Sequence, residues 1–328
     1  MKTFKKIALG LIVILITIAL GGFGYIYHKL NKMYVKDEPT KNEESTKIKS
    51  NTVDGITNIL LVGTDGKNFE KGNRSDSMMV LTIDRKNKAI KLSSIERDTY
   101  VDIPGHSTEK LTHAYAYGGI DLLRQVFKIN LDLDIDKYVI VNFISFMDIV
   151  DAIGGVKVNV KENDITELNK IIGSCYIYYA RQAKADGKEI KSKEEVTKSG
   201  AQRLNGYQTL AFSRIRHNDD AFNRDNRQRQ VLQSVYNEFL DGNLKEYKKC
   251  FDIILDNIKT NISPIEMLKL IYTVYKINNK NIEQFEFPLE EYRNGHILNK
   301  QKGWVLEWDK EPNLKAWHKF IFGDDSKY

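Results

Sequence analysis

Residues 57–95 read TNILLVGTDGKNFEKGNRSDSMMVLTIDRKNKAIKLSSI, and this stretch decides the class of fold. Its first apolar run, residues 57–62, is followed by Gly-Thr-Asp, which predicts a buried strand that enters a turn. Residues 78–83 and 89–95 are two further strand candidates, and the polar segment between them predicts a hairpin loop. The stretch therefore predicts three strands, of which the last two form a hairpin.

Helix and strand patterns alternate along the remainder of the chain. Strands are also predicted at 138–143 and 156–160, whereas the polar, lysine-rich residues 162–199 are interpreted as a surface excursion with helical pieces. Helices are predicted at 119–127, 145–153, 207–213, 223–239 and 264–275. Strands interleaved with helices indicate an α/β or α+β sandwich. Because no change of composition interrupts residues 54–323, we expect one domain there, followed by a short tail at 324–328.

The composition is that of a globular protein. Of the 328 residues, 41% are hydrophobic and 29% are charged, which is enough for a sizeable core. The net charge of +6 is modest for this length and gives no nucleic-acid signature. The two cysteines, Cys175 and Cys250, make neither a disulfide framework nor a metal site, and their pairing is left open.

The N-terminus has the pattern of a membrane anchor. Three lysines within residues 1–6 precede an uncharged run at 7–27, and a spanning helix needs about 20 apolar residues. We expect an uncleaved, single-pass transmembrane helix there; a long cleaved signal peptide is the alternative. The lysines place residues 1–6 in the cytoplasm and the rest outside the cell membrane, which excludes nucleic acid as a partner. Residues 28–53 are polar and charged, so we expect a linker.

Two aspartates flank the predicted strands of the opening stretch. Asp65 lies just past the end of the first strand, and Asp76 lies just before the second. Carboxylates so placed could share a divalent ion, since Mg²⁺ is usually held by one or two carboxylates together with substrate phosphates. The alternative is that both are turn residues, because Asp favours turns.

Arg74 and Arg97 lie beside the same strands. Arg97 follows the strand at 89–95, and Asp98, Thr99 and Tyr100 come directly after it. A lone arginine after a strand is usually solvated, but this polar set is rich for an ordinary sheet edge. The sequence leaves a functional and a solvated role for Arg97 equally open.

A second arginine-rich stretch is AFSRIRHNDDAFNRDNRQRQ at 211–230, which holds five of the 12 arginines of the chain. A planar guanidinium binds phosphate through two parallel hydrogen bonds, which an ammonium cannot do. Arg224 and Gln228 share one face of the helix predicted here, near an N-terminus that already favours anions. Arg227 lies beside that face and stays unassigned, whereas Arg229 should point elsewhere. The alternative is a solvated basic face.

Together these groups predict a site for a lipid-linked pyrophosphate. They supply carboxylates for a metal and arginines for a di-anion, on a domain tethered to the membrane. The sequence contains no Ser-His-Asp set, no H-E-x-x-H and no G-x-x-x-x-G-K-[ST] motif. These absences argue against hydrolase triads, zinc proteases and P-loop enzymes.

Several ordered motifs together resemble the LytR-CpsA-Psr family of Gram-positive bacteria. The motifs are NILLVGTD (58–65), RSDSMMVLTID (74–84), SSIERDTYVDIPG (93–105), KLTHAYAYGG (110–119), AQRLNGYQTLAFSRIRH (201–217), R-x-x-R-Q (224–228) and GWVLEWDKEPNLKAWHKFIFG (303–323). The resemblance covers essentially the whole region after the predicted anchor. It implies an α-β-α sandwich with a central mixed sheet and a long apolar pocket for a polyprenyl tail.

The resemblance also implies an activity. It is that of a phosphotransferase which moves an anionic glycopolymer, teichoic-acid-like or capsular, from an undecaprenyl-pyrophosphate carrier to peptidoglycan. The acceptor would be the 6-hydroxyl of N-acetylmuramic acid. The alternatives are a polyprenyl-pyrophosphate hydrolase and a non-enzymatic, membrane-bound regulator that binds lipid-linked intermediates.

The roles implied for single residues follow the motifs. Asp65 and Asp76 would hold Mg²⁺ or Mn²⁺ against the pyrophosphate. The pyrophosphate oxygens would be bound by Arg74, Arg97, Arg214, Arg216, Arg224 and Gln228. The catalytic residues would be Arg97, Asp76, Arg214 and Asp98, where Asp98 is either the proton acceptor or a group that orients Arg97.

The chain departs from the family pattern at three positions. Ala221 stands where the family commonly has an acid, so Asp219 or Asp220 would have to supply it. Glu96 replaces the usual proline before Arg-Asp, and Ser213 replaces a usual alanine. We expect neither of the last two changes to abolish activity.

Overall fold

The computed structural model describes residues 27–28, 30–36, 53–66, 69, 72–216, 221–241 and 258–326. The transmembrane helix expected at 7–27 lies outside the described residues, except for its last residue, as does most of the linker expected at 28–53. Cys250, His217, Asp219 and Asp220 lie outside them as well. Within the described ranges, no helix is long and apolar enough to cross a bilayer.

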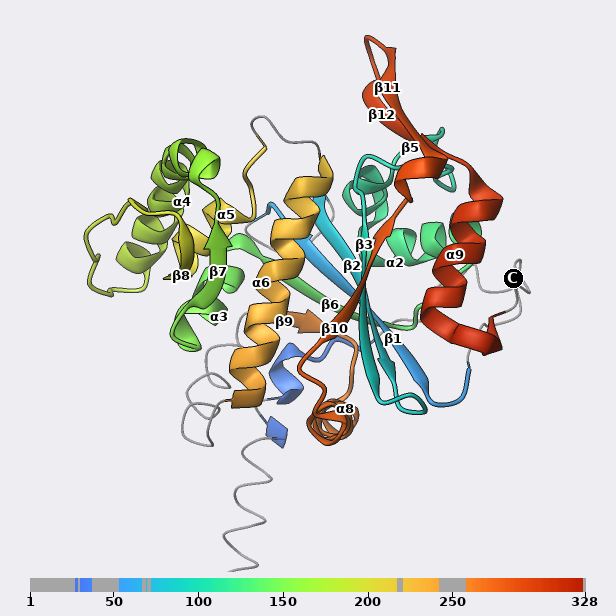
Figure 1. Cartoon of the computed structure of the whole chain (residues 1–328), viewed down its shortest axis with the longest axis horizontal. Helices are drawn as coiled ribbons and strands as arrows, with labels where there is room; N and C mark the ends of the chain where they lie inside the picture. Colours follow the sequence, from blue (N-terminus) through green and yellow to red (C-terminus); the bar gives the residue numbers. More distant parts are fainter. Residues whose placement is uncertain are drawn as a thin grey trace, which may run out of the picture.

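A six-stranded mixed sheet forms the centre of the fold (Figure 1). Its strand order is β10-β3-β2-β1-β6-β9, in which β1–β6 and β3–β10 are parallel pairs and the others are antiparallel. The strands span Ile56–Thr64 (β1), Ser75–Asp84 (β2), Ala89–Ile95 (β3), Lys137–Asn142 (β6), Ile258–Thr260 (β9) and Ile282–Phe287 (β10). The three strands predicted within 57–95, including the hairpin, are confirmed.

Helices cover both faces of this sheet. On one face, Leu60 and Val62 pack against α2 (Leu111–Asn130) and α9 (Lys310–Phe322). On the other, Ile59 and Leu61 face α6 (Ala221–Asp241) and α8 (Pro264–Ile277). Successive side chains of a strand point to opposite faces, so a strand buried on both sides reads as a continuous apolar run. The predicted α-β-α sandwich with a mixed sheet is confirmed.

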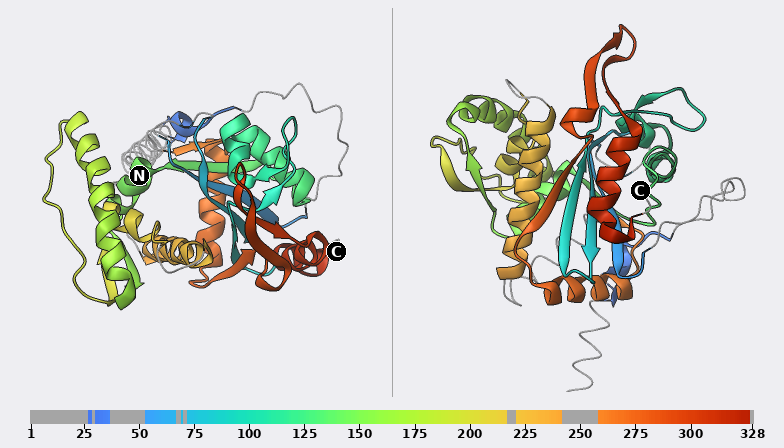
Figure 2. Two further views of the ribbon diagram at one scale, coloured as in Figure 1. Left: turned by 90° about the horizontal axis from the view of Figure 1, so that it is seen from above. Right: turned by 45° about the vertical axis from the view of Figure 1, so that its right-hand side comes forward.

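A smaller unit lies beside the sheet. It consists of α3 (Phe143–Ala152), α4 (Ile165–Ala185), α5 (Gly206–Phe212) and the antiparallel pair of β7 (Val156–Val160) with β8 (Gly200–Leu204). Seen from above, α4 lies on the far side of the molecule from α2 and α9 (Figure 2). The interpretation of residues 162–199 as a surface excursion was wrong for α4. Its residues Leu168, Ile172 and Cys175 are fully buried in the core of this unit.

Local signals set several helix starts close to the cavity described below. Asn205 and Gln208 form a reciprocal capping box at the start of α5. The side chain of Asn142 accepts a hydrogen bond from Ser145 N–H at the start of α3. The helix predicted at 119–127 corresponds to the second of two helical segments in α2, which are joined by a kink at Gly119 (φ 68°). The first segment, which begins at Leu111, was not predicted.

The C-terminal part of the domain includes a projecting hairpin. β11 (Arg293–Asn299) pairs with β12 (Gly303–Trp308), and the hairpin extends beyond one end of the sheet (Figure 1). A short pair, β4 (Tyr100–Val101) with β5 (Glu109–Lys110), lies at its base. Leu306 N–H donates to Asp98 O at 3.0 Å, which joins the hairpin to the segment that follows β3.

Residues 30–36 pack against the opposite end of the domain. Leu30 and Met33 are 2% and 5% exposed, and Ile258, Met267 and Leu268 pack against them. Val35 N–H also donates to Thr260 O at 2.8 Å. The beginning of the segment predicted as a linker therefore belongs to the folded surface.

Candidate active site

A cavity of about 670 Å³ lies between the central sheet and the smaller unit. Apolar residues from β1, β2, β6, α3, α4, α5 and α6 line most of it, and they are Leu61, Val62, Met79, Val139, Val141, Phe143, Phe146, Ile149, Val150, Ile171, Leu210, Val231, Leu232 and Val235. Ligand pockets in proteins are typically apolar with a few placed polar groups. This cavity has the shape and lining to hold a hydrocarbon chain.

Polar groups gather at the end of the cavity where β1 and β3 end and β2 begins. They are Thr64, Asp65, Arg74, Asp76, Ser77, Arg97, Asn142, Ser213, Arg214, Arg216, Arg224 and Gln228. We call this end the mouth. The structure thus brings together all residues for which pyrophosphate or metal binding was predicted, from strands and helices up to about 160 positions apart. Asp98 is not among the described residues that line the cavity.

Arg97 is held by carboxylates on two sides. Its Nη1 makes a short ion pair with Asp76 Oδ1, and its Nε lies 3.5 Å from Asp98 Oδ2. Lys110 Nζ approaches the other oxygen of Asp98 at 3.3 Å. Asp98 therefore bridges Arg97 and a lysine, which suits a group that orients the guanidinium at the mouth.

Asp65 closes the loop between β1 and β2. Its Oδ1 accepts from Arg74 N–H at 2.8 Å, and its own N–H donates to Arg74 O at 3.3 Å. The turn role that the sequence left open is therefore real, and the same carboxylate also faces the cavity.

The donor set at the mouth fits a magnesium ion that is shared with a substrate. Asp65 and Asp76 both line the mouth, and Mg²⁺ is commonly bound by one or two carboxylates plus phosphate oxygens. Among the residues described, no group of three or more His, Cys, Asp and Glu side chains could hold a metal alone. Substrate oxygens would have to complete the coordination.

Among the described residues that line the cavity, five arginines outnumber three carboxylates, which are those of Asp65, Asp76 and Glu167. In the described part of the chain, the guanidinium groups of Arg74 and Arg216 have no hydrogen-bond or ion-pair partner. Burial, and then the charges of Arg97 and Arg224, lower the pKa of Arg216. A bound di-anion would relieve this repulsion, so the mouth is electrostatically suited to a pyrophosphate.

Arg214 lies against the wall of the smaller unit. Its guanidinium carbon is 4.9 Å from the centroid of the Phe143 ring, and its Nη1 donates to Cys175 Sγ at 3.6 Å. Burial raises the pKa of the Cys175 thiol, which stays neutral beside the arginine. These contacts direct Arg214 along the cavity wall.

Arg224 is bound by two buried acids that sequence reasoning did not assign to it. Its Nη2 donates to Glu96 Oε2 at 3.2 Å and to Asp225 Oδ1 at 3.0 Å. Glu96 is fully buried, and Arg224 and Asp225 are each 3% exposed. Burial, and then the charge of Asp225, raise the pKa of Glu96 well above its usual value. The only sequence signal was the departure at Glu96 itself.

Gln228 joins α6 to β2. Its Oε1 accepts from the Ser77 hydroxyl at 2.6 Å, and its Nε2 donates to Ser213 O at 3.4 Å. Ser77 was not predicted as a site residue; it follows Asp76 directly and lines the mouth.

The two remaining arginines of α6 are structural. Arg227 pairs with Asp164 at 3.0 Å, and Arg229 pairs with Glu286 of β10 at 3.2 Å. The prediction that Arg229 points elsewhere is confirmed. The structure also settles Arg227, which the sequence left unassigned.

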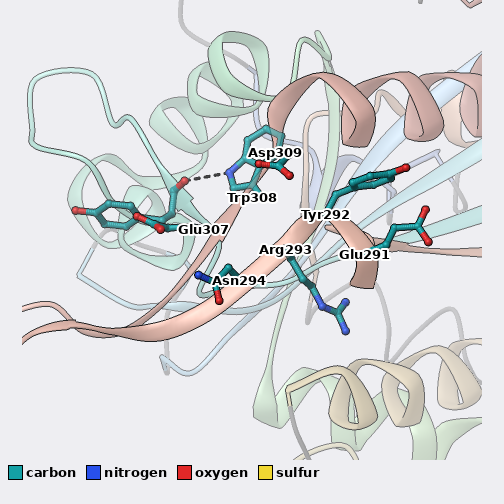
Figure 3. A pocket seen from close by; sticks show the side chains of 8 residues that line it. Glu291, Tyr292, Arg293, Asn294, Glu307, Trp308 and Asp309 are labelled. Atoms are coloured by element: carbon teal, nitrogen blue, oxygen red, sulfur yellow. Dashed lines mark hydrogen bonds between the residues drawn. The ribbon is translucent and has the colours of Figure 1, made fainter.

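A second, more open pocket of about 470 Å³ lies at the base of the β11–β12 hairpin (Figure 3). Trp308 lines it and donates its indole N–H to Tyr100 O at 3.1 Å, whereas Arg293 turns away toward Glu286 at 2.7 Å. The rest of the lining comprises Tyr100, Glu291, Tyr292, Asn294, Glu307 and Asp309. Tyr100 lies three residues after Arg97, so this polar, aromatic pocket adjoins the segment that carries Arg97.

Comparison with known proteins assigns the chain to a family. The profile of the LytR_cpsA_psr family matches residues 21–316. This chain belongs to the LytR-CpsA-Psr family.

Relatives in the LytR-CpsA-Psr family carry names that state an activity. The chain is 33% identical over 299 residues to a Bacillus cereus protein named polyisoprenyl-teichoic acid–peptidoglycan teichoic acid transferase TagU, covering 87% of this chain and 88% of that one. It is 31% identical over 316 residues to TagT of Bacillus subtilis, which bears the corresponding name, covering 92% of each.

A solved LytR-CpsA-Psr structure holds a lipid. It is YwtF (TagT) of Bacillus subtilis with bound octaprenyl pyrophosphate, and it is 26% identical to this chain. The TM-score is 0.59, over 84% of this chain and 92% of that one.

Proposed function

We propose that this protein is a membrane-anchored phosphotransferase that moves an anionic glycopolymer from an undecaprenyl-pyrophosphate carrier to peptidoglycan. The observation that carries the proposal is the cavity, whose apolar walls end in a mouth that holds five arginines and two aspartates. A polyprenyl pyrophosphate has the same order of parts, an apolar tail that ends in a di-anion. The names and the bound lipid of the relatives support this assignment.

The reaction we propose is an in-line attack of a sugar hydroxyl on the phosphorus next to the glycopolymer. The phosphorus–oxygen bond to the carrier breaks, undecaprenyl phosphate leaves with the electron pair of that bond, and the proton of the attacking hydroxyl passes to this leaving phosphate. Phosphoryl transfer asks the protein chiefly for positioning and charge stabilisation. Arg97, fixed between Asp76 and Asp98, would supply both at the mouth, together with Arg74 and Arg216, whose guanidinium groups have no partner among the described residues.

Mg²⁺ or Mn²⁺ fits beside these arginines. Held by Asp65 and Asp76, it would neutralise further charge on the pyrophosphate. Asp98 contacts Arg97 and Lys110, so we assign it to the positioning of Arg97.

We assign the acceptor side to the second pocket. Its lining combines Tyr and Trp rings with carboxylates and an amide, which offer apolar faces and hydrogen-bond acceptors to a sugar. The proposed acceptor is the 6-hydroxyl of N-acetylmuramic acid in peptidoglycan, and the donor polymer is teichoic-acid-like or capsular.

We also propose that residues 7–27 anchor the chain in the cell membrane, with the domain outside the cell. The three lysines before this apolar run support that orientation. In this arrangement the carrier lipid and the active site share the same side of the membrane.

The test is the variant Arg97→Ala, assayed with lipid-linked glycopolymer and a peptidoglycan acceptor. Transfer should fall by about 10²–10³, which is typical when one charge-stabilising donor is removed. Binding of the lipid pyrophosphate should persist through the other arginines. Arg85→Ala is the matched control, because Arg85 lies in the β2–β3 turn and its side chain is 56% exposed.

Three outcomes would contradict the proposal. Unimpaired transfer in Arg97→Ala would show that the mouth does not have the role assigned to it. Release of glycopolymer phosphate without any acceptor would indicate a hydrolase. Lipid binding that never gives product in the wild type would indicate a regulator.

A further inference from the structure

Helix α8 exposes large apolar side chains on its outer side. Ile265, Tyr272 and Tyr275 are 52%, 60% and 64% exposed. Lys269 and Lys276 are also exposed, and the ammonium of Lys276 lies 5.5 Å from the centroid of the Tyr272 ring. We call these five residues the α8 outer face. Exposed apolar patches that alternate with polar groups usually mark an interaction surface.

The α8 outer face is set by the packing of the opposite side of the helix. Met267, Leu270, Val274 and Ile277 pack into the core beneath the sheet. Ser263, whose hydroxyl accepts from Glu266 N–H at 3.4 Å, and Pro264 fix the start of the helix. The rotation of α8 is therefore fixed, and the outer face must point away from the domain.

The N-terminal chain reaches the domain at this helix. Leu30 and Met33 are buried against Met267 and Leu268 of α8. Only residues 28 and 29 separate Leu30 from the 21-residue uncharged run at 7–27. If that run spans the bilayer, as the proposed function requires, Leu30 and the part of α8 near it are held within about 10 Å of the membrane surface.

We propose that the α8 outer face docks on the anionic surface of the bilayer beside the anchor. Tyr side chains favour the membrane–water interface, where the ring is buried and the hydroxyl stays wet. Lysines on such a face are attracted to anionic lipid headgroups. The inference rests on the anchoring part of the proposed function, and it adds the orientation of the domain on the membrane.

The direction of the cavity agrees with this docking. α6 runs from the mouth, where Arg224 lies, toward the end of the molecule at which α8 lies (Figure 1). Val231, Leu232 and Val235 line the cavity along that course. Docking through α8 would point the apolar end of the cavity at the bilayer and the mouth away from it.

The experiment places a tryptophan on the α8 outer face. The full chain, as Tyr275→Trp, is reconstituted in vesicles of phosphatidylglycerol and brominated phosphatidylcholine. Ile297→Trp is the matched control, because Ile297 is 73% exposed on the hairpin at the other end of the domain (Figure 1). The fluorescence of the wild type, with its three native tryptophans, is subtracted from both.

We expect the emission of Trp at 275 to shift to the blue and to be quenched by the brominated lipid, whereas Trp at 297 shows neither effect. Replacing Lys269 and Lys276 by serine should lower the equilibrium constant for docking by about fivefold for each lysine lost. Absence of quenching at 275, or equal quenching at both positions, would overturn the inference. Protection of Trp at 275 from an aqueous quencher without lipid quenching would overturn it too and would indicate contact with a second copy of this chain, since the vesicles hold no other protein.

Two readouts separate this inference from the proposed function. Quenching needs no turnover, so quenching without transfer would refute the transferase and support the docking. Transfer without quenching would refute the docking alone. Release of the chain from vesicles by alkaline extraction would refute the anchor and, with it, the docking.

Discussion

Replacing Glu96 by glutamine tests how the buried acids around Arg224 are protonated. Glu96 and Asp225 both contact Arg224, and all three side chains are almost completely buried. Two carboxylates and one guanidinium in a dry site would leave an unbalanced negative charge, so the cluster should retain one proton. Burial, and then Asp225, raise the pKa of Glu96 well above its usual value, which places that proton on Glu96. Glutamine is neutral and keeps a donor toward Asp225.

The magnitude follows from proton linkage. Glu96 in the unfolded chain titrates near pH 4.5, and between that pH and its raised folded pKa the folded state holds one extra proton. The free energy of unfolding of the wild type therefore falls by about 1.4 kcal/mol per pH unit across this window. The contribution of Glu96 is complete below the unfolded pKa and is lost as the pH rises through the folded pKa. Glu96→Gln lacks this slope, so its stability relative to the wild type should rise with pH.

Denaturant unfolding of the full chain in detergent, at a series of pH values, measures this difference. Glu283→Gln is the control, since Glu283 is exposed on β10 and should give a flat difference. Arg224→Met should lose about 3–5 kcal/mol, because it leaves buried acids without their cation. A loss of that size for Glu96→Gln at neutral pH, or a difference that does not change with pH, would show that Glu96 is ionised and would refute the reasoning.

Three shorter predictions concern the cavity and its surroundings. Chelation by EDTA should abolish transfer in the wild type, and added Mg²⁺ should restore it. Added Mg²⁺ should not restore transfer in the double variant Asp65→Asn with Asp76→Asn. Undiminished transfer in EDTA would contradict the metal site. Val235→Trp should weaken the binding of long-chain carriers by about one to two orders of magnitude, since overpacking costs about 1–3 kcal/mol. In a competition assay, the binding of short-chain analogues should be unchanged. Trp308→Ala should raise the KM for the glycan acceptor and leave the KM for the lipid donor unchanged in steady-state kinetics.

The strands of the sheet were predictable where both of their faces are buried. β1, β2 and β3 are covered by helices on both faces, so apolar residues predominate in their central parts and mark them as strands. β10, with the sequence IEQFEF, was missed because only Ile282 and Phe287 are buried and polar residues interrupt the apolar pattern between them. Two of these polar residues, Gln284 and Glu286, bind Arg229 of α6. The burial of α4 was missed because residues 162–199 taken together are polar and rich in lysine, although helical pieces were expected there. Its buried face, Leu168, Ile172 and Cys175, follows helical spacing that a closer inspection of periodicity could have found.

The sequence predicted which residues form the site, but it did not predict which of them contact one another. The motifs name residues at the mouth because they lie next to strand ends, just past the end of α5 or in the N-terminal part of α6, and the fold brings these segments together. No local pattern could show that Glu96 meets Arg224, since the partners are 128 residues apart. The same holds for Ser77 and Gln228, which are 151 residues apart. Such pairs are fixed by the packing of α6 on the sheet, which depends on the whole core.

The layout of the domain also explains why its cavity is so apolar. Along α6, the rise of 1.5 Å per residue places Arg224 about 16 Å from Val235, so a pyrophosphate at the mouth lies well away from the α8 end. If that end rests on the bilayer, the first part of the carrier tail must leave the lipid. Each exposed CH₂ would cost about 0.8 kcal/mol, or roughly 4 kcal/mol for one five-carbon isoprene unit. Apolar walls that reach from Val235 to Val231 offset this cost, and they allow the charged end to be presented to the cell wall rather than to the membrane.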